Sequence, residues 1–408
     1  ELFFKVNKMA KLLEEYRNEV VILFLENSIE YYISYFAVLK VDSVIVPMAL
    51  SNPVYRLNVV KNQTGSRLII ADSAQRDKIQ SLEMDVFWVD TNTIESNTQN
   101  EKPFFEIPDE IIMLLETSGS INESKLVMLT NENIFSNILS FRDSIEYMGS
   151  EEKAMIISFL GSSHGNTVEM LFYLYYHIPV VLYDGAVNVT RILRLISLNE
   201  VTRVHLVSPL LTLLCKTDRE VISRYDLSKL HRISFGSCYF SKDLLDSALE
   251  RFPNAILIQD YGLTEASPLV ASLGEKDWRT KFGSLGKVLS GIEMKIDKMD
   301  AENDMGELLI KGKSVCKGYF KNNNCDLLNN GWLRTGDLVY CDNEGYLFFV
   351  GRKGRRFKCS GYNINPEDIE KIVVTYKGVK NVLVYAEKDL IRENQVCMDI
   401  EIDKESEI

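Results

Sequence analysis

The sequence predicts an α/β protein: a large N-terminal domain of parallel sheets flanked by helices, a β-rich, barrel-like subdomain, and a partial small α+β unit at the end. The first observation is that short apolar runs alternate with longer amphipathic runs up to about residue 280, a pattern typical of parallel sheets with covering helices. The second is that the apolar runs then become short and glycine-rich. The third is a Gly-flanked basic turn at 351–358, after which one more helix and two strands are expected.

Length and charge narrow the class of protein. A chain of 408 residues is long enough for two or three structural units. Its 46 Lys and Arg against 58 Asp and Glu give a net charge of −12. This argues against a nucleic-acid or membrane-surface binder, because such proteins need a net basic face. No apolar run reaches the roughly 18 residues of a spanning helix, so we predict no membrane span.

The cysteines and the start of the chain bear on location. The seven cysteines are scattered and form no CxxC motif or Cys/His spacing suited to zinc. This fits reduced thiols and predicts a cytoplasmic protein. No secretory leader opens the chain, and it starts at Glu1 rather than Met, so we expect a fragment or a trimmed chain.

The first part of the chain is expected to alternate strands and helices. EVVILFL (19–25) indicates a buried strand, and the amphipathic run over 26–41 indicates a helix with Asn27 and Ser28 as caps. A further helix is expected near 54–64. The other expected strands are 43–47, 67–71, 86–89, 111–116, 154–160, 179–183, 203–207, 232–235 and 255–260.

In the second part, short apolar runs between glycines favour antiparallel strands with tight turns. These strands are expected at 292–296, 306–312, 332–340 and 344–351. Pro366 opens an expected helix over 366–376, and strands are expected at 379–387 and 395–402. The basic turn predicts a domain boundary that divides the chain into 1–352 and 353–408.

The first segment with chemical character is ETSGSINESKLVMLT (116–130), between an apolar strand and a helical run. Its small residues can gather backbone N–H groups and hydroxyls around an anion, and Lys125 adds a positive charge. It is not a Walker loop, because no Gly-Lys-Ser/Thr follows Gly119 at the right spacing. The alternative is an ordinary polar hairpin loop.

The second segment is QDYGLTEASPLV (259–270). A purine can stack on Tyr261 beside the flexible Gly262, Thr264 can bond a phosphate oxygen, and Glu265 can hold Mg²⁺ through its oxygens. The alternative is a turn with a capping Thr and a solvated Glu.

The third segment runs over 331–370. Asp337 lies in a Gly-bounded turn, where a carboxylate can accept two ribose hydroxyls, and Arg352 ends the next β unit. The alternatives are a turn Asp and a surface Arg.

In this order, the three segments resemble the adenylate-forming superfamily: acyl- and aryl-CoA ligases, adenylation domains of peptide synthetases, and luciferases. TSGSINESKL stands where the family has TSGTTGxPKG, YGLTE matches YGxTE, and GWLRTGDL matches WxxTGD. GELLIKGKSVCKGYF and GRKGRRFKCSGYNINPEDIE resemble two further family motifs. The resemblance covers nearly the whole chain, and several ordered motifs are far more specific than any one of them.

The resemblance implies ATP-dependent activation of a carboxylic acid. In the family, the acid attacks the α-phosphate of ATP, pyrophosphate leaves, and an acyl-adenylate forms. A thiol then displaces AMP. The implied cofactors and partners are therefore ATP, Mg²⁺, a small carboxylic acid, and CoA or the phosphopantetheine of an acyl carrier protein.

The resemblance also assigns site residues. By similarity, the nucleotide-binding residues are Thr117, Ser118, Gly119, Ser120, Gly236, Ser237, Cys238, Tyr261, Gly262, Asp337 and Arg352. Tyr261 and the backbone of 236–238 would contact adenine, and Asp337, assisted by Arg352, the ribose hydroxyls. The catalytic candidates are Lys125, which would contact the outer phosphates, Thr264, which would touch the α-phosphate, and Glu265, which would hold Mg²⁺.

Three departures from the family pattern limit this assignment. Asn122, Ser124 and Leu126 replace Gly, Pro and Gly in the phosphate loop, which restricts close backbone approach. A degenerate, non-catalytic nucleotide-binding member is therefore an alternative. Gly354 stands at the family's hinge position, usually Asp or Lys, and still permits a large rotation. Only 353–408 follow Arg352, whereas a complete lid has about a hundred residues. We therefore assign no catalytic Lys and expect impaired adenylation by this chain.

The region SFLGSSHGNTVEMLFYLYY (158–176) matches the part of the family that gates the acid. His164 stands where amino-acid-activating domains place an Asp to pair with the ammonium, and Val168 and Phe235 are further substrate-binding candidates. An imidazole cannot replace that carboxylate, so an acyl or aryl acid is favoured. The alternatives are an adenylation domain of a peptide or polyketide synthetase, and a His with only a structural role.

The same region contains a pattern of another enzyme class. Gly161-Ser162-Ser163-His164-Gly165 fits GxSxG, and His205 and His231 lie downstream. A serine hydrolase using Ser163 is therefore a remote alternative, because this short pattern explains none of the later motifs.

Overall fold

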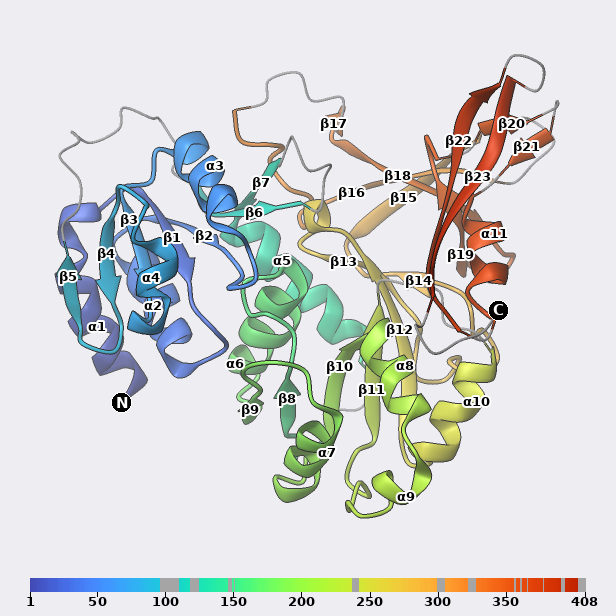
Figure 1. Ribbon diagram of the computed structural model, residues 1–408, viewed down its shortest axis with the longest axis horizontal. Coiled ribbons are helices and arrows are strands. Elements are labelled where there is room, and N and C mark those ends of the chain that lie inside the picture. The colour runs from blue at the N-terminus through green and yellow to red at the C-terminus, as the bar shows by residue number, and fades with distance from the viewer. Residues whose placement is uncertain are drawn as a thin grey trace.

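The computed structural model describes the chain in segments that are separated by gaps. The described residues are 1–95, 110–117, 125–145, 149, 151–236, 242–298, 305–321, 328–355, 357–359, 362–364, 366–376, 378–389 and 393–402. Figure 1 shows two sheets side by side, with the third sheet and the C-terminal hairpin beyond them. The predicted α/β class is confirmed. Within the described ranges, no helix combines the length and apolar character needed to cross a lipid bilayer.

The first sheet contains seven strands in the order β5-β4-β3-β1-β2-β6-β7. The inner strands are parallel, and β5 and β7 run antiparallel to their neighbours. The strands are β1 Val20–Phe24, β2 Val44–Pro47, β3 Leu68–Ala71, β4 Asp85–Trp88, β5 Thr93–Glu95, β6 Ile111–Glu116 and β7 Leu126–Thr130. The helices are α1 Leu2–Leu12, α2 Ile29–Lys40, α3 Val54–Thr64 and α4 Arg76–Ile79, with 3₁₀ turns at Glu14–Tyr16 and Ser73–Gln75. Every residue of β1 is buried, as expected for a strand covered on both faces.

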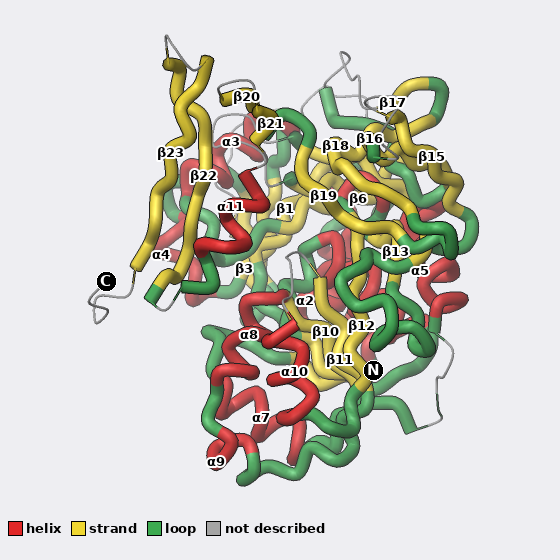
Figure 2. The backbone as a smooth tube through the Cα atoms, turned by 90° about the vertical axis from the view of Figure 1, so that its right-hand side faces the viewer, coloured by secondary structure: helices red, strands yellow, loops and turns green. Residues whose placement is uncertain are grey.

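The second sheet also contains seven strands, in the order β14-β13-β12-β11-β10-β8-β9. Its parallel strands are β8 Ala154–Ile156, β9 Val180–Leu182, β10 Arg203–Val207, β11 Arg232–Gly236 and β12 Ile256–Gly262, and the antiparallel ones are β13 Leu269–Ser272 and β14 Lys287–Val288. The helices are α5 Asn131–Ser144, α6 Phe172–Tyr175, α7 Val189–Leu198, α8 Ser208–Lys216, α9 Arg219–Ile222 and α10 Lys242–Arg251. A π-helix covers Gly165–Leu171, and a 3₁₀ turn covers Thr264–Ala266. Figure 2 shows α7, α8 and α10 together on one side of β10–β12.

The third sheet is antiparallel and forms the predicted β-rich part. Its strands are β15 Ile292–Lys298, β16 Gly306–Gly312, β17 Leu328–Asn329, β18 Trp332–Cys341 and β19 Leu347–Arg352. The C-terminal elements are β20 Phe357–Cys359, β21 Tyr362–Ile364, α11 Pro366–Val373, β22 Val379–Asp389 and β23 Glu393–Ile402. The predicted boundary at residue 352 coincides with the end of β19 and stays a prediction.

One predicted strand is shorter than expected. The apolar run 154–160 forms a strand only as far as Ile156. Beyond it, the Asn27 side chain donates to Ser158 O at 2.8 Å and accepts from Leu160 N at 2.9 Å. A side-chain amide therefore takes the backbone groups that a neighbouring strand would otherwise bond, and the chain turns into the π-helix.

The two parallel sheets share one hydrophobic core. A single cluster of buried side chains joins Leu23 of β1 and Ile156 of β8 through residues of α2, α5 and the π-helix. Thr130 caps α5 by accepting from Asn133 N at 3.0 Å, and the Asn133 side chain accepts from Thr130 N at 2.9 Å. This reciprocal capping fixes the start of α5.

Asn137, one turn after Asn133 on α5, joins this core to the turn that follows β12. It is fully buried, donates to Leu269 O at 2.7 Å and to Ala266 O at 3.3 Å, and accepts from Leu269 N at 3.2 Å. One amide thus satisfies three backbone groups on either side of the turn.

We expect Asn137→Ala to lower the free energy of unfolding by about 1–3 kcal/mol, because it leaves buried backbone groups without partners. Urea denaturation measures the change. Asn199→Ala is the matched control, since Asn199 makes a single bond to Leu195 O at a helix end; its effect should stay within about 0.5 kcal/mol. Equal losses in the two variants would contradict the anchoring role.

Candidate active site

Several predicted nucleotide-binding residues lie at the carboxyl ends of neighbouring strands in the second sheet. Gly236 ends β11, and Tyr261 and Gly262 end β12, which pairs with β11 in parallel. The chain is crowded here: a Cβ on Gly262 would lie 2.2 Å from Pro268 O, and one on Gly236 would lie 2.9 Å from Asp260 O. The carboxyl edge of an open α/β sheet is where ligands of such folds bind.

Tyr261, Asp337 and Arg352 form one linked group. The Tyr261 Oη donates to Asp337 Oδ2 at 2.5 Å, and Arg352 Nε lies 2.8 Å from Asp337 Oδ1. Asp337 and Arg352 are directly opposite on β18 and β19. Three predicted residues from two sheets therefore meet in the structure.

The Asp337 carboxylate is buried while Arg352 is half-exposed. Burial raises the pKa of Asp337, and the Arg352 charge opposes this rise. Burial also raises the pKa of Tyr261 well above its usual value, so the phenol stays protonated and its O–H group donates the hydrogen bond to Asp337. Arg352 lies beside Asp337 Oδ1 as an ion pair, and among the described residues this oxygen accepts no hydrogen bond of regular geometry, so it keeps the capacity to accept one from a ligand hydroxyl.

Glu265 and Lys125 are linked through a tyrosine that the sequence reasoning did not select. Tyr319 Oη donates to Glu265 Oε1 at 2.7 Å, and Lys125 Nζ lies 5.0 Å from the centroid of the Tyr319 ring. Thr264 begins the 3₁₀ turn that carries Glu265. Tyr319 is the tyrosine of the GYF that ends the GELLIKGKSVCKGYF motif. The motif therefore marked its position but not its contact with Glu265.

The phosphate-loop stem is well defined at its base. Thr117 N donates to Lys125 O at 3.0 Å, closing the hairpin of β6 and β7. Ser118, Gly119, Ser120, Ser237 and Cys238 lie outside the described residues, so their predicted contacts stay predictions.

The oxygen chemistry of Glu265 fits Mg²⁺. No group of three or more His, Cys, Asp or Glu gathers to hold a metal anywhere in the part of the chain that the structure describes. A cation held by Glu265 can take further oxygen ligands from water or from the phosphates of a nucleotide.

The predicted acid-binding residue His164 lies against His205 of β10, with ring centroids 3.5 Å apart and the ring planes tilted by 33°. Burial lowers the pKa of His164 to about 3 and that of His205 well below its usual value, so both imidazoles are neutral. His205 Nδ1 lies 3.9 Å from Asp260 Oδ2. Burial raises the pKa of Asp260 to about 6.

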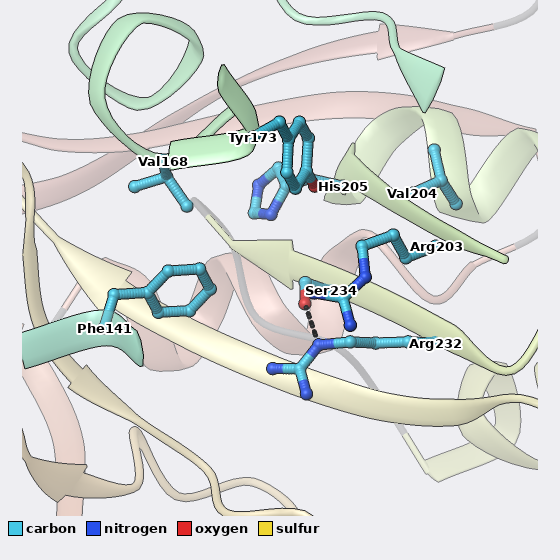
Figure 3. Close-up of a pocket in the computed structure, with 8 residues that line it drawn as sticks. All are labelled: Phe141, Val168, Tyr173, Arg203, Val204, His205, Arg232 and Ser234. Atoms are coloured by element: carbon cyan, nitrogen blue, oxygen red, sulfur yellow. Dashed lines mark hydrogen bonds between the residues drawn. The ribbon is translucent and has the colours of Figure 1, made fainter. Parts of the chain in front are cut away.

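Beside His205 is a cavity of about 10 Å³, which has room for about one water molecule. Its lining residues come from α5, the π-helix, α6, β10 and β11, and Figure 3 shows Arg232 bonded to Ser234 within it. Val168 lines this cavity, and its predicted contact with the acid stays a prediction. Phe235 instead packs with Leu206 and Leu257 in the core on the other face of the sheet, and Ser234 lines the cavity.

The hydrolase alternative gains no support from this geometry. The Ser163 Oγ, the His164 Nε2 and the His205 Nδ1 are buried without hydrogen-bond partners among the described residues. A serine nucleophile needs a base within hydrogen-bond reach.

Glu169 is a fully buried carboxyl group on the π-helix beside this region. Burial raises its pKa from 4.5 to about 8. Between these two values the folded protein binds more protons than the unfolded chain. The free energy of unfolding therefore falls as the pH rises through that window.

We expect wild type to lose stability between about pH 7, above which His164 and His205 are mostly neutral in the folded and unfolded chain alike, and about pH 8, at up to about 1.4 kcal/mol per pH unit. Glu169→Gln should remove most of this slope. Urea denaturation across the pH range measures it. Glu83→Gln, at an exposed position, should keep the wild-type slope; a Glu169→Gln slope equal to wild type would contradict the assignment.

A model of the AMP-binding enzyme family matches residues 1–320. Among curated proteins, 4-coumarate-CoA ligase 1 of Narcissus pseudonarcissus is 26% identical over 404 residues, covering 91% of this chain and 73% of the ligase. The 4-coumarate–CoA ligase-like 2 of Arabidopsis thaliana is 29% identical over 297 residues, covering 69% of this chain and 51% of its own length.

Among solved structures, o-succinylbenzoate CoA synthetase of Bacillus subtilis with its acyl-adenylate intermediate has a TM-score of 0.85. It is 23% identical, and the match covers 100% of this chain and 84% of the synthetase. The same enzyme has also been solved with ATP and a magnesium ion. With the family model matching most of its length, the chain belongs to the AMP-binding enzyme family.

Proposed function

We propose that this protein activates a carboxylic acid with ATP and transfers the acyl group to a thiol. The observation that carries the proposal is the buried Asp337 carboxylate held between Tyr261 and Arg352, beside a sheet edge suited to ligands. The ligases and the acyl-adenylate complex among the relatives support the same reaction.

In the first step, an oxygen of the acid attacks the α-phosphorus of ATP, and the bond to pyrophosphate breaks. Mg²⁺ bound with ATP would offset negative charge on the phosphates. Glu265 would hold this ion, Thr264 would contact the α-phosphate, and Lys125 would leave the Tyr319 ring for the outer phosphates. Asp337 would bind the ribose hydroxyls and fix the nucleotide relative to the acid.

In the second step, a thiol sulfur attacks the acyl carbon, and the bond to AMP breaks. The names of the relatives favour CoA over a carrier-protein phosphopantetheine as the thiol. A cytoplasmic location stays a prediction.

The neutral His164 and His205 support an acyl or aryl acid rather than an α-amino acid. The ammonium group of an amino acid would face desolvated imidazoles that carry no negative charge. Burying an ammonium without a counter-ion is strongly unfavourable.

ATP–pyrophosphate exchange with a panel of acids tests the reaction and the substrate class. We expect acid-dependent exchange that is slow in this chain because the lid is incomplete, with aryl and acyl acids at least about ten-fold faster than α-amino acids, and loss of exchange in Glu265→Gln. Faster exchange with amino acids would favour the peptide-synthetase alternative. ATP binding without exchange for any acid would favour the non-catalytic alternative.

Asp337→Asn tests the ribose contact. We expect ATP to bind about 10- to 100-fold more weakly, because hydrogen bonds to a charged group contribute about 1.5–3 kcal/mol. Calorimetry with ATP and with 2′,3′-dideoxy-ATP measures this: wild type should discriminate between the two nucleotides and the variant should not. Asp297→Asn is the control, since Asp297 pairs with Arg334 at 2.8 Å on the exposed part of the same sheet. Undiminished discrimination in Asp337→Asn would contradict the assignment.

A further inference from the structure

The segment Cys316–Phe320, which follows β16, is bonded both to the phosphate-loop hairpin and to the turn that carries Glu265. Along β7, Met128 N donates to Gly318 O at 2.9 Å, and Phe320 N donates to Leu126 O at 2.8 Å. At the other side, Cys316 N donates to Glu265 O at 2.8 Å. The segment Cys316–Phe320 therefore fixes the spacing between the hairpin stem and Glu265.

Tyr319 extends this connection through its side chain. Its hydroxyl donates to Glu265 Oε1 at 2.7 Å, and its ring lies beneath Lys125 Nζ at 5.0 Å. A free glutamate side chain has much rotamer freedom. A hydrogen bond to one carboxylate oxygen restricts the rotation of the whole group and so orients the other oxygen.

We propose that Tyr319 is a positioning residue that holds the Glu265 carboxylate in the orientation for Mg²⁺. This inference rests on the proposed function. Partners that hydrogen-bond a metal-binding carboxylate orient it, and their loss typically weakens metal affinity by about 10- to 100-fold. The attraction between the Lys125 ammonium and the face of the ring also helps to hold the Tyr319 side chain in place.

Tyr319→Phe separates the hydroxyl from the ring. Phe keeps the apolar packing and the surface beneath Lys125, and loses the hydroxyl that bonds Glu265. Tyr16→Phe is the matched control, because Tyr16 Oη also donates to a carboxylate, Asp85 Oδ2, at 2.9 Å, and Tyr16 is fully buried in the 3₁₀ turn that precedes β1.

The readout is Mg²⁺ affinity rather than turnover. Mg²⁺ is titrated into protein with a fixed, saturating concentration of ATP, and thermal unfolding or calorimetry reports binding. We expect the half-saturating Mg²⁺ concentration to rise about ten-fold in Tyr319→Phe, with ATP affinity in the absence of Mg²⁺ unchanged. Tyr16→Phe should unfold at a lower temperature and keep the wild-type Mg²⁺ dependence.

Glu265→Gln completes a double-mutant cycle with Tyr319→Phe. If Tyr319 acts through Glu265, its loss should add no further weakening in the Glu265→Gln background. Wild-type Mg²⁺ affinity in Tyr319→Phe, equal shifts in Tyr319→Phe and Tyr16→Phe, or full additivity with Glu265→Gln would each overturn the inference. A wild type that binds ATP without any Mg²⁺ dependence would instead refute the metal site of the proposed function.

Discussion

The site depends on one buried carboxylate. Asp337 belongs to the third sheet, Tyr261 to the end of the second, and their bond at 2.5 Å ties the two sheets together at the carboxyl edge of the second sheet. A buried carboxylate without partners is strongly unfavourable. Asp337 is therefore stabilised only while the third sheet lies where Asp337 can reach Tyr261. Arg352 supplies the opposing charge. Its side chain is half-exposed, so a nucleotide can approach from this side. The position of the third sheet is thereby set by the same group that the proposed ligand would use.

A protein of net negative charge that binds a polyanion needs positively charged side chains close to the binding site. The net charge of −12 provides no general steering toward ATP. The described cations near the site are few and already oriented: Arg352 on Asp337, and Lys125 over the Tyr319 ring. A cation resting on an aromatic ring is held with little desolvation. Its transfer to a phosphate therefore breaks a weaker interaction than a salt bridge between buried groups.

The alternation of apolar runs predicted the parallel strands of both large sheets, because a strand buried on both faces is apolar at every position, as in Val20–Phe24. Ordered motifs placed Tyr261, Asp337 and Arg352 together. The sequence did not show which face of β11 lines the cavity: Phe235 and Ser234 are adjacent, and a period of two leaves their faces undecided until the helices are placed. Nor did it show that the His205 ring would lie against the His164 ring, since that contact depends on how the π-helix packs against β10.

After β19, the residues on the two sides of Gly354 are bonded to different parts of the structure. Lys353 N donates to Gly336 O at 2.8 Å, which fixes it to the third sheet. Arg355 instead pairs with Glu367 at 3.2 Å and with Glu370 at 2.6 Å, which fixes it to α11. Between them, Gly354 has φ +92°, and a Cβ there would meet nothing within 4 Å. A rotation at Gly354 would thus carry α11 and its hairpin while Arg352 stays on Asp337, and it would leave the proposed ribose contact unchanged.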